Sequence, residues 1–422
     1  MQLYRVGGVS FDGNMKIITA LLVWTLAVIT ARSEPPPSSN AVEMAALTKA
    51  LDEAYNTYQS TNDDSGKFYK AWRELEKSHL PQMLLLAQKE PESQPACDVF
   101  LWIAMNAAAN RGSFFTNRLQ SLDCLTKYHS TNSKVGPLCS YLGRYWPWQW
   151  RERAVVDFLK SAVKNNPVRA NRAQAIYALG CLYANKSEQL ADFENWSKAP
   201  FYAKNLTTND LAEIPTFGSS QQAAADAEHK FNEVIANYDD CLDLRELRNP
   251  KEEAPHLKKL AEQNLFALEH FSLGKKAPEI EAEGVDGKKF KLSDSRGKIC
   301  VLNFWASWCG PCMQMVPVER ALARRMQGKS FAMIGVNGDG IMPDAKRAIE
   351  REKMTWPSFW NGKEGPKGPI ATAWNVHGWP TIFVLDADGI IRFKFEGYGS
   401  QSSNILNGSV DELMKKLPSK KQ

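Results

Sequence analysis

The sequence lacks an excess of charge of either sign. Its 52 lysines and arginines are balanced by 47 aspartates and glutamates, so the formal net charge is only +5 over 422 residues. The basic residues are spread among the acidic ones, and no nucleic-acid-binding motif occurs. We therefore expect no nucleic-acid partner. The length and the 44% hydrophobic content allow two or three domains, each with its own core.

The sequence also lacks the ligand pattern of a structural zinc site. Such a site needs two pairs of closely spaced cysteines or histidines. Cys-x-x-Cys occurs once, at Cys309 and Cys312, and His-x-x-His does not occur. Redox chemistry therefore explains this pair better than zinc binding or plain burial. We expect neither a metal nor an organic cofactor, because the two cysteines can themselves carry electrons.

The N-terminal apolar run is short. Ile17 to Ala31 falls below the roughly 20 residues that a comfortable membrane span requires. Lys16 precedes the run, and small residues near Ser33 offer a cleavage site. We predict that residues 1–34 are an export signal, with an uncleaved membrane anchor as the alternative, and that residues 35–40 are a stiff Pro/Ser linker. The predicted location is the periplasm or cell envelope, with membrane contact only if the signal stays uncleaved.

Residues 41–272 have the spacing of helices. Alanine, leucine, lysine and glutamate recur every three to four positions, and short turns with proline, asparagine or glycine separate the helical segments. No strict period is visible, so we predict a loose array of helical hairpins of unknown role. The predicted helices are Glu43–Thr57, Phe68–His79, Pro81–Ala87, Asp98–Ala109, Asn117–Tyr128, Arg151–Asn165, Val168–Asn185, Ala223–Tyr238 and His256–Phe271.

The sequence does contain a reactive motif, Trp308-Cys309-Gly310-Pro311-Cys312. The apolar run Ile299–Trp305 before it predicts a buried strand, and apolar residues after it follow helical spacing (Met315, Val318, Leu322 and Met326). Free N–H groups and the macrodipole at a helix start favour a thiolate, whose pKa falls from about 8.5 to roughly 7 or below in such motifs. We therefore expect Cys309 to attack a disulfide and Cys312, one turn further in, to resolve the mixed disulfide.

A second signal lies downstream at Gly378-Trp379-Pro380-Thr381, just before the apolar run Ile382–Leu385. A cis X-Pro bond is tolerated at such a position. With the cysteine motif, it makes residues 273–418 resemble a thioredoxin-like domain of the TlpA/ResA kind. The resemblance implies that this loop faces the cysteine pair. It also implies that Trp308 shields the pair, that Pro380 shapes the substrate groove, and that Gly310, Pro311 and Trp379 support the site.

The resemblance extends to the flanking sequence. Ala277-Pro278-Glu279 and Asp286-Gly287-Lys288 resemble the extra N-terminal hairpin of that family, and the helical half resembles the region ahead of some bacterial TlpA-like domains. The implied fold is an all-α helical-hairpin domain, residues 41–272, followed by an α/β domain, residues 273–418, with a central mixed sheet flanked by helices. Within the second domain we predict strands Phe331–Asn337, Thr381–Asp386 and Ile390–Phe395 and helices Asp344–Glu352 and Ser403–Lys416.

Two positions depart from the family pattern. Asn303 stands where thioredoxin carries a buried aspartate, and Met315 stands where ResA-like reductants often carry a glutamate. Both carboxylates that usually move the proton of the resolving cysteine are thus absent. Either another group or water serves instead, or turnover is slow.

Six cysteines lie outside the motif: Cys97, Cys124, Cys139, Cys181, Cys241 and Cys300. Export would permit pairing, and Cys124 and Cys139 are near enough in sequence to be candidates. Burial as small apolar residues explains most of them better.

The sequence therefore predicts an exported thiol-disulfide oxidoreductase with a redox-active Cys309–Cys312 disulfide. Its expected partners are protein thiols or disulfides of the cell envelope and an upstream electron donor, and the resemblance favours a reductant. One alternative is a thiol-dependent peroxidase of the peroxiredoxin relatives, although the proline of the Pro-x-x-x-Thr/Ser-x-x-Cys context is missing before Cys309. The other is a partner-binding envelope protein with a redox-sensing domain.

Overall fold

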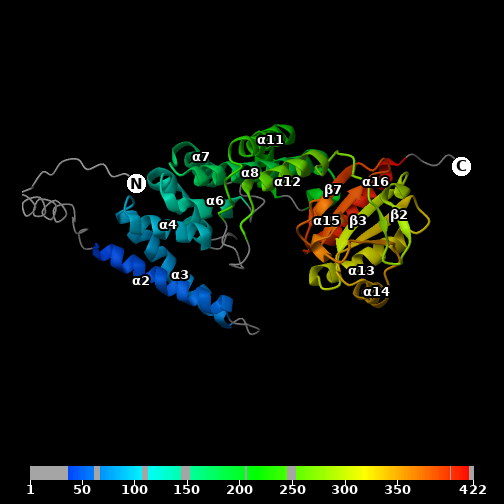
Figure 1. Ribbon diagram of the computed structural model, residues 1–422, viewed down its shortest axis with the longest axis horizontal. Helices are drawn as coiled ribbons and strands as arrows, with labels where there is room; N and C mark the ends of the chain where they lie inside the picture. The colour runs from blue at the N-terminus through cyan, green and yellow to red at the C-terminus, as the bar shows by residue number, and fades with distance from the viewer. Residues whose placement is uncertain are drawn as a thin grey trace, which may run out of the picture. The chain divides into compact units, whose positions relative to one another are not determined.

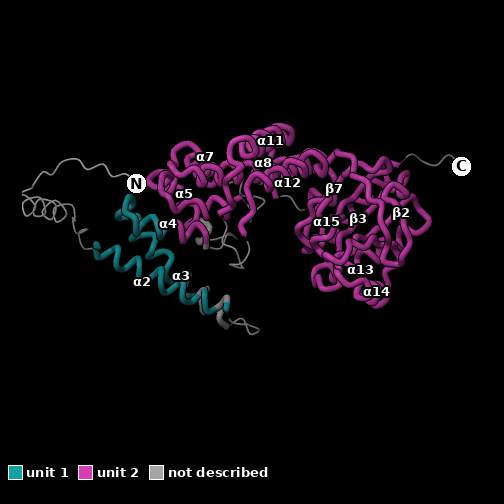
Figure 2. Tube along the Cα trace, viewed as in Figure 1, with its two compact units in different colours: residues 1–99 teal, residues 100–422 magenta. Residues whose placement is uncertain are grey.

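The computed structural model describes residues 37–60, 67–106, 113–143, 153–204, 207–244, 253–399 and 401–417 (Figure 1). The predicted export signal, residues 1–34, lies outside these ranges. Within them, no helix combines the length and the apolarity that crossing a membrane requires. The chain divides into two compact units, residues 1–99 and 100–422, which are described separately (Figure 2).

The first unit is a helical hairpin. It contains α2 (Ser39–Ser60), α3 (Lys67–Lys89) and the start of α4 (Gln94–Asn106). The prediction of a break before Pro81 is wrong, because α3 runs through this proline. The neighbouring side chains Leu80 and Met83 are fully buried, and this packing offsets the hydrogen bond that the proline cannot donate.

The helices of the second unit that precede its sheet pack around α8 (Arg169–Trp196), which contacts α6, α7, α11 and α12. Gly180 lets α8 approach α11 closely, because a Cβ there would lie 2.7 Å from the ring of Phe231. The other helices are α5 (Ser113–Cys124), α6 (Gly136–Leu142), α7 (Arg153–Asn165), α9 (Pro200–Ala203), α10 (Thr208–Glu213), α11 (Ser220–Asn237) and α12 (Leu257–His270). The predicted helix Val168–Asn185 is thus too short at its C-terminal end.

A five-stranded mixed sheet follows, in the order β5-β4-β3-β6-β7. Its strands are β3 (Ile299–Trp305), β4 (Phe331–Asn337), β5 (Ser358–Trp360), β6 (Thr381–Leu385) and β7 (Ile391–Glu396). The predicted bounds of β3 and β4 are confirmed, and β6 and β7 differ from theirs by one residue. The expected extra hairpin is also present, formed by β1 (Glu281–Glu283) and β2 (Lys289–Lys291).

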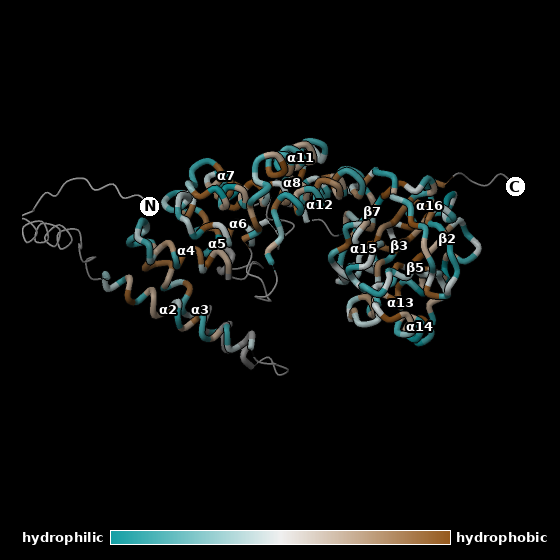
Figure 3. Tube along the Cα trace, in the orientation of Figure 1, coloured by the Kyte–Doolittle hydropathy of each residue, from teal (hydrophilic) through white to brown (hydrophobic). Residues whose placement is uncertain are grey.

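The central strand β3 divides the core into two layers. It is parallel to β4 and antiparallel to β6, and all seven of its residues are buried. Val301 and Trp305 face the layer of α13 (Gly310–Arg325) and α16 (Ser402–Lys416). Leu302 and Phe304 face the opposite layer, as the alternation of side chains along a strand requires. Figure 3 shows that the central strands of the sheet are hydrophobic. Two further helices are α14 (Met342–Arg351) and α15 (Pro369–Ala373). The predicted fold class is confirmed.

The last turn of α8 contributes to the core of the sheet layer. Trp196 is buried in the same apolar cluster as Val301 and Trp305, and its ring stacks on that of Phe393 with centroids 4.0 Å apart. Nearby, the Lys394 ammonium lies 3.0 Å from a carboxylate oxygen of Glu188. The helices and the sheet of this unit are therefore joined by packing as well as by the chain.

We expect Trp196→Ala to lower the free energy of unfolding by about 3–5 kcal/mol, because it opens a cavity against Phe393. Urea denaturation of the full chain would measure this. Asn195→Ala, which truncates an exposed neighbour, is the control and should change stability little. Equal stability of the two variants would contradict the packing role of Trp196.

Candidate active site

Cys309 and Cys312 lie where β3 gives way to α13, and they form a disulfide. Cys309 is the N-cap of the helix and is 4% exposed, whereas Cys312, in the first turn, is 0% exposed. Pro311 also stands in the first turn, where the helix needs no N–H from it. Both residues are thus buried, and Cys312 is buried completely.

The helix start supplies a positive environment for the Cys309 sulfur. The backbone N–H of Cys312 donates to Cys309 Sγ at 3.1 Å. This is one of the N–H groups that a helix leaves without an internal partner, and the macrodipole adds to its effect. In the dithiol form, the same contact stabilises a Cys309 thiolate, which is the nucleophile in disulfide exchange.

The Trp379 loop lies beside the cysteine motif. The peptide bond between Trp379 and Pro380 is cis, as expected. Pairing of Phe304 with Thr381 aligns the start of β6 with the end of β3. The rings of Trp308 and Trp379 meet edge to face with centroids 6.1 Å apart, and Trp308 is 56% exposed. The two tryptophans thus form an aromatic surface next to Cys309.

A third loop, after β4, completes this end of the sheet. Gly338 must be a glycine here, because a Cβ would lie 2.5 Å from the Trp379 ring. The buried carboxylate of the next residue, Asp339, accepts hydrogen bonds from the backbone N–H of Ser307 at 3.1 Å and from its hydroxyl at 2.7 Å. Asn337 Nδ2 donates to it at 2.7 Å. Asp339 therefore fixes the segment that leads into Cys309.

Sequence reasoning missed Glu319. This residue of α13 is completely buried, and Asn303 Nδ2 of β3 donates to its Oε1 at 2.5 Å. Burial raises the pKa of the Glu319 carboxyl from 4.5 to about 8. The available signal was its spacing, because Cys312, Met315, Glu319 and Leu322 share one helical face. A glutamate therefore interrupts the apolar stripe that packs on the sheet.

The other described thiols do not resemble a reactive pair. Cys124, Cys139, Cys241 and Cys300 are free, so the possible pairing of Cys124 with Cys139 is not formed. Burial raises the pKa of Cys139 to about 12 and that of Cys300 to about 11. Thiols of such high pKa react slowly, because the thiolate is the reactive form.

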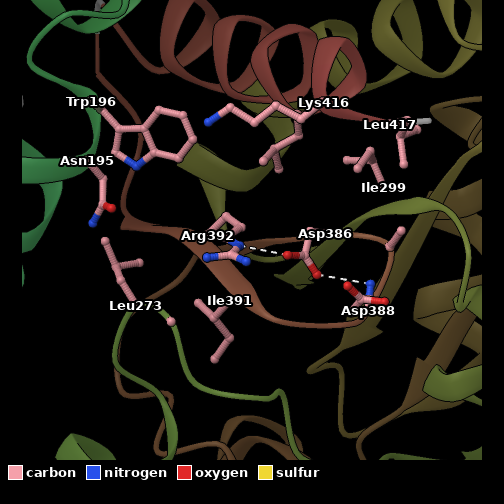
Figure 4. A pocket seen from close by; sticks show the side chains of 13 residues that line it. Asn195, Trp196, Leu273, Ile299, Asp386, Asp388, Ile391, Arg392, Lys416 and Leu417 are labelled. Carbon is pink, nitrogen blue, oxygen red and sulfur yellow. Dashed lines mark hydrogen bonds and ion pairs between the residues drawn. The ribbon is translucent and has the colours of Figure 1, made fainter. Parts of the chain in front are cut away.

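A pocket of about 520 Å³ lies away from the cysteines, at the last turns of α8 and α16 and the turn between β6 and β7 (Figure 4). Arg392 Nε donates to Asp386 at 2.7 Å, and the Lys416 ammonium lies 4.6 Å from the centre of the Trp196 ring. None of its described lining residues is a cysteine.

Comparison with known proteins identifies the family. Residues 273–394 match the AhpC/TSA family. The thiol-disulfide oxidoreductase ResA of Bacillus cereus is 30% identical over 152 residues, which are 36% of this chain and 84% of that protein. The chain belongs to the ResA family of thiol-disulfide oxidoreductases.

Two other proteins resemble the same part of this ResA-family chain. The thioredoxin-like protein YneN of Bacillus subtilis is 32% identical over 28% of this chain and 68% of its own length. A solved thiol:disulfide interchange protein of the thioredoxin family from Chlorobium tepidum is 25% identical, with a TM-score of 0.29, over 33% of this chain and 95% of its own. Within this family, the structure brings together Cys309, Cys312, Trp308, Trp379 and Pro380, whose roles remain predictions.

We expect Glu319 to make stability depend on pH. Its folded pKa of about 8 lies above its ordinary value of 4.5. The folding stability that is linked to the protonation of Glu319 is therefore fully present below pH 4.5 and is lost as the pH rises through 8. Glu319→Gln removes this titration. Its stability relative to the wild type should increase from pH 5 to pH 8, by on the order of a few kcal/mol, and then level off.

Urea denaturation at several pH values would check this prediction for the disulfide form of both proteins. Glu350→Gln, which removes the same charge from an exposed position of α14, should give a curve parallel to that of the wild type. A parallel curve for Glu319→Gln as well would show that Glu319 keeps its ordinary pKa.

Proposed function

We propose that the chain is an exported thiol-disulfide oxidoreductase that reduces protein disulfides of the cell envelope through Cys309 and Cys312. The supporting observation is the disulfide at the start of α13, with Cys309 Sγ held on the N–H of Cys312. In this proposal, residues 41–272 form a helical domain and residues 273–418 form the redox domain, with Trp196 packed into its core.

The proposed reaction has two exchange steps. The Cys309 thiolate attacks one sulfur of a substrate disulfide, forms a mixed disulfide and releases the other substrate sulfur as a thiolate. The Cys312 thiol then loses its proton and attacks Cys309 Sγ, which breaks the mixed disulfide and restores the Cys309–Cys312 bond. Two electrons pass to the substrate, whose two sulfurs each take up a proton. An upstream dithiol returns the pair to its reduced form.

The surroundings of Cys309 suit a polypeptide substrate. Trp308 is largely exposed and lies against Trp379, so the two rings offer apolar contact area beside the reacting sulfur. We propose that Pro380 shapes the groove for the substrate backbone, while Gly310 and Pro311 fix the turn between the cysteines. The short apolar run within residues 1–34 supports export to the periplasm or envelope.

Replacement of each cysteine tests the exchange chemistry. We expect Cys309→Ser to reduce disulfide exchange to the background rate, because it removes the nucleophile. Cys312→Ser should instead accumulate a mixed disulfide with a protein substrate such as insulin, visible by non-reducing electrophoresis. Cys124→Ser, which changes a thiol outside the pair, should exchange normally.

Other outcomes would support other functions. Exchange that persists in Cys309→Ser would contradict the proposed nucleophile. Rapid hydroperoxide consumption by the wild type, lost in Cys309→Ser, would support the peroxidase. Partner binding without any disulfide exchange would support a sensing role for the redox domain.

The direction of electron flow follows from the reduction potential of the pair. Equilibration of the full chain with glutathione or dithiothreitol buffers would measure it. For a reductant we expect a value near that of thioredoxin, about −270 mV, or lower. A value near −120 mV would mark a protein that introduces disulfides, and the proposed direction would then be wrong.

A further inference from the structure

Glu319 and Asn303 form a polar pair inside the apolar layer that holds the cysteines. Glu319 is 0% exposed, and its Oε1 accepts from Asn303 Nδ2 at 2.5 Å. Glu319 Oε2 and Asn303 Oδ1 are also buried, and neither has a hydrogen-bond partner among the residues that the structure describes. Groups of this kind are costly to bury, so their presence requires an explanation.

The pair lies on the cysteine side of the sheet. Val301 and Trp305, which share a strand face with Asn303, pack in one cluster with Cys309 and Cys312. Glu319 follows Cys312 by seven residues on α13, which is two helical turns, so the two side chains lie on the same helical face. Their Cα atoms are about 10.5 Å apart along the axis.

Of the oxygens Glu319 Oε2 and Asn303 Oδ1, the first belongs to an acid that can hold or lose a proton. A neutral Glu319 can donate from one oxygen and accept the Asn303 amide on the other, whereas the ionised form can only accept. With Asn303 Oδ1 available as an acceptor, the site suits the neutral acid. The ionised carboxylate also keeps the hydrogen bond from Asn303.

Burial raises the pKa of Glu319, and no positive group among the described residues opposes this rise. On α13, Arg320 donates to the Glu352 carbonyl oxygen and Arg325 pairs with Asp411 of α16. In the neighbouring segments, Arg351 pairs with Glu352, Lys415 pairs with Glu412, and Lys329 donates to the Met326 sulfur. Cys312 lies on the same helical face as Glu319, so the redox pair is a titrating neighbour of this carboxyl.

We propose that Glu319, held by Asn303, is a positioning residue whose ionisation is linked to the redox state of the Cys309–Cys312 pair. The inference rests on the proposed function. Reduction breaks the S–S bond, takes two electrons from a donor dithiol that becomes a disulfide, and adds two protons, one to each sulfur. Where Cys309 then ionises, its thiolate and the Glu319 carboxylate repel each other across a weakly screened core.

This repulsion shifts the pKa of Glu319 in a known direction. The pKa of Glu319 is higher in the dithiol form than in the disulfide form, so reduction takes up additional protons between the two pKa values. Above this range, Glu319 is charged in both forms and destabilises the reduced pair. The protein is then a stronger reductant at alkaline pH. Cys309 precedes Glu319 by ten residues, or about 15 Å along the helix axis. At this distance and an effective dielectric constant near 20, the effect is on the order of tenfold or somewhat less in the exchange constant.

The test is the reduction potential of the full chain as a function of pH, for the wild type, Glu319→Gln and the exposed control Glu350→Gln. From pH 6 to pH 10 the wild-type potential should fall further than that of Glu319→Gln, by about 30 mV for a tenfold change. Glu350→Gln should follow the wild type. Curves of wild type and Glu319→Gln that stay parallel throughout, with normal exchange, would overturn the inference and leave the proposed function intact. Absence of any exchange in the wild type would instead refute the proposed function.

A second measurement needs no variant. Infrared difference spectra of the wild-type protein, labelled with ¹³C at its glutamate carboxyl groups, would follow the band of a protonated buried carboxyl against pH. We expect its loss at a higher pH in the dithiol form than in the disulfide form. Equal midpoints in the two forms would overturn the inference even if Glu319→Gln failed to fold.

Discussion

The active-site geometry depends on the hydrogen bond from the Cys312 backbone N–H to Cys309 Sγ. This contact exists because β3 ends and α13 begins within a few residues, so a fixed strand end delivers the sulfur to the free N–H groups of a helix. Strand β3 can be fixed because it is buried along its whole length and paired on both sides. The reactivity expected of Cys309 thus depends on the fixed position of β3 as well as on the cysteine itself.

The direction of the strands explains why three distant loops meet at this point. Strands β3 and β4 are parallel, so their C-terminal ends share one edge of the sheet, and β6 is antiparallel to β3, so it begins at that edge. The loops carry Trp308, Asp339 and Trp379. Asp339 holds the segment before Cys309 by hydrogen bonds, and Gly338 lets the Trp379 ring lie close. Polar and steric constraints therefore act on the same short segment from two sides.

Features of the structure that depend on neighbouring residues could be predicted from the sequence. The bounds of β3 and β4 followed from apolar runs. The proline ahead of β6 marked a position where a cis bond is tolerated, and the bond before Pro380 is cis. The continuity of α3 through Pro81 could not be predicted, because it depends on side chains packed from elsewhere. The burial of Trp196 is similar. Its partner Phe393 is almost two hundred positions away, and no pattern around either residue indicates the contact.

Glu319 shows the same limit at the site itself. The family pattern directs attention to two positions, Asn303 and Met315, and neither carries a carboxylate. The structure instead shows a buried carboxyl at Glu319, which accepts a hydrogen bond from Asn303. An isolated glutamate in an apolar layer would be costly, and the amide lowers that cost by supplying a hydrogen bond. Asn303 and Glu319 must therefore be considered as one unit: an aspartate at 303 would set two carboxyls against each other, and an apolar residue there would leave Glu319 without its donor.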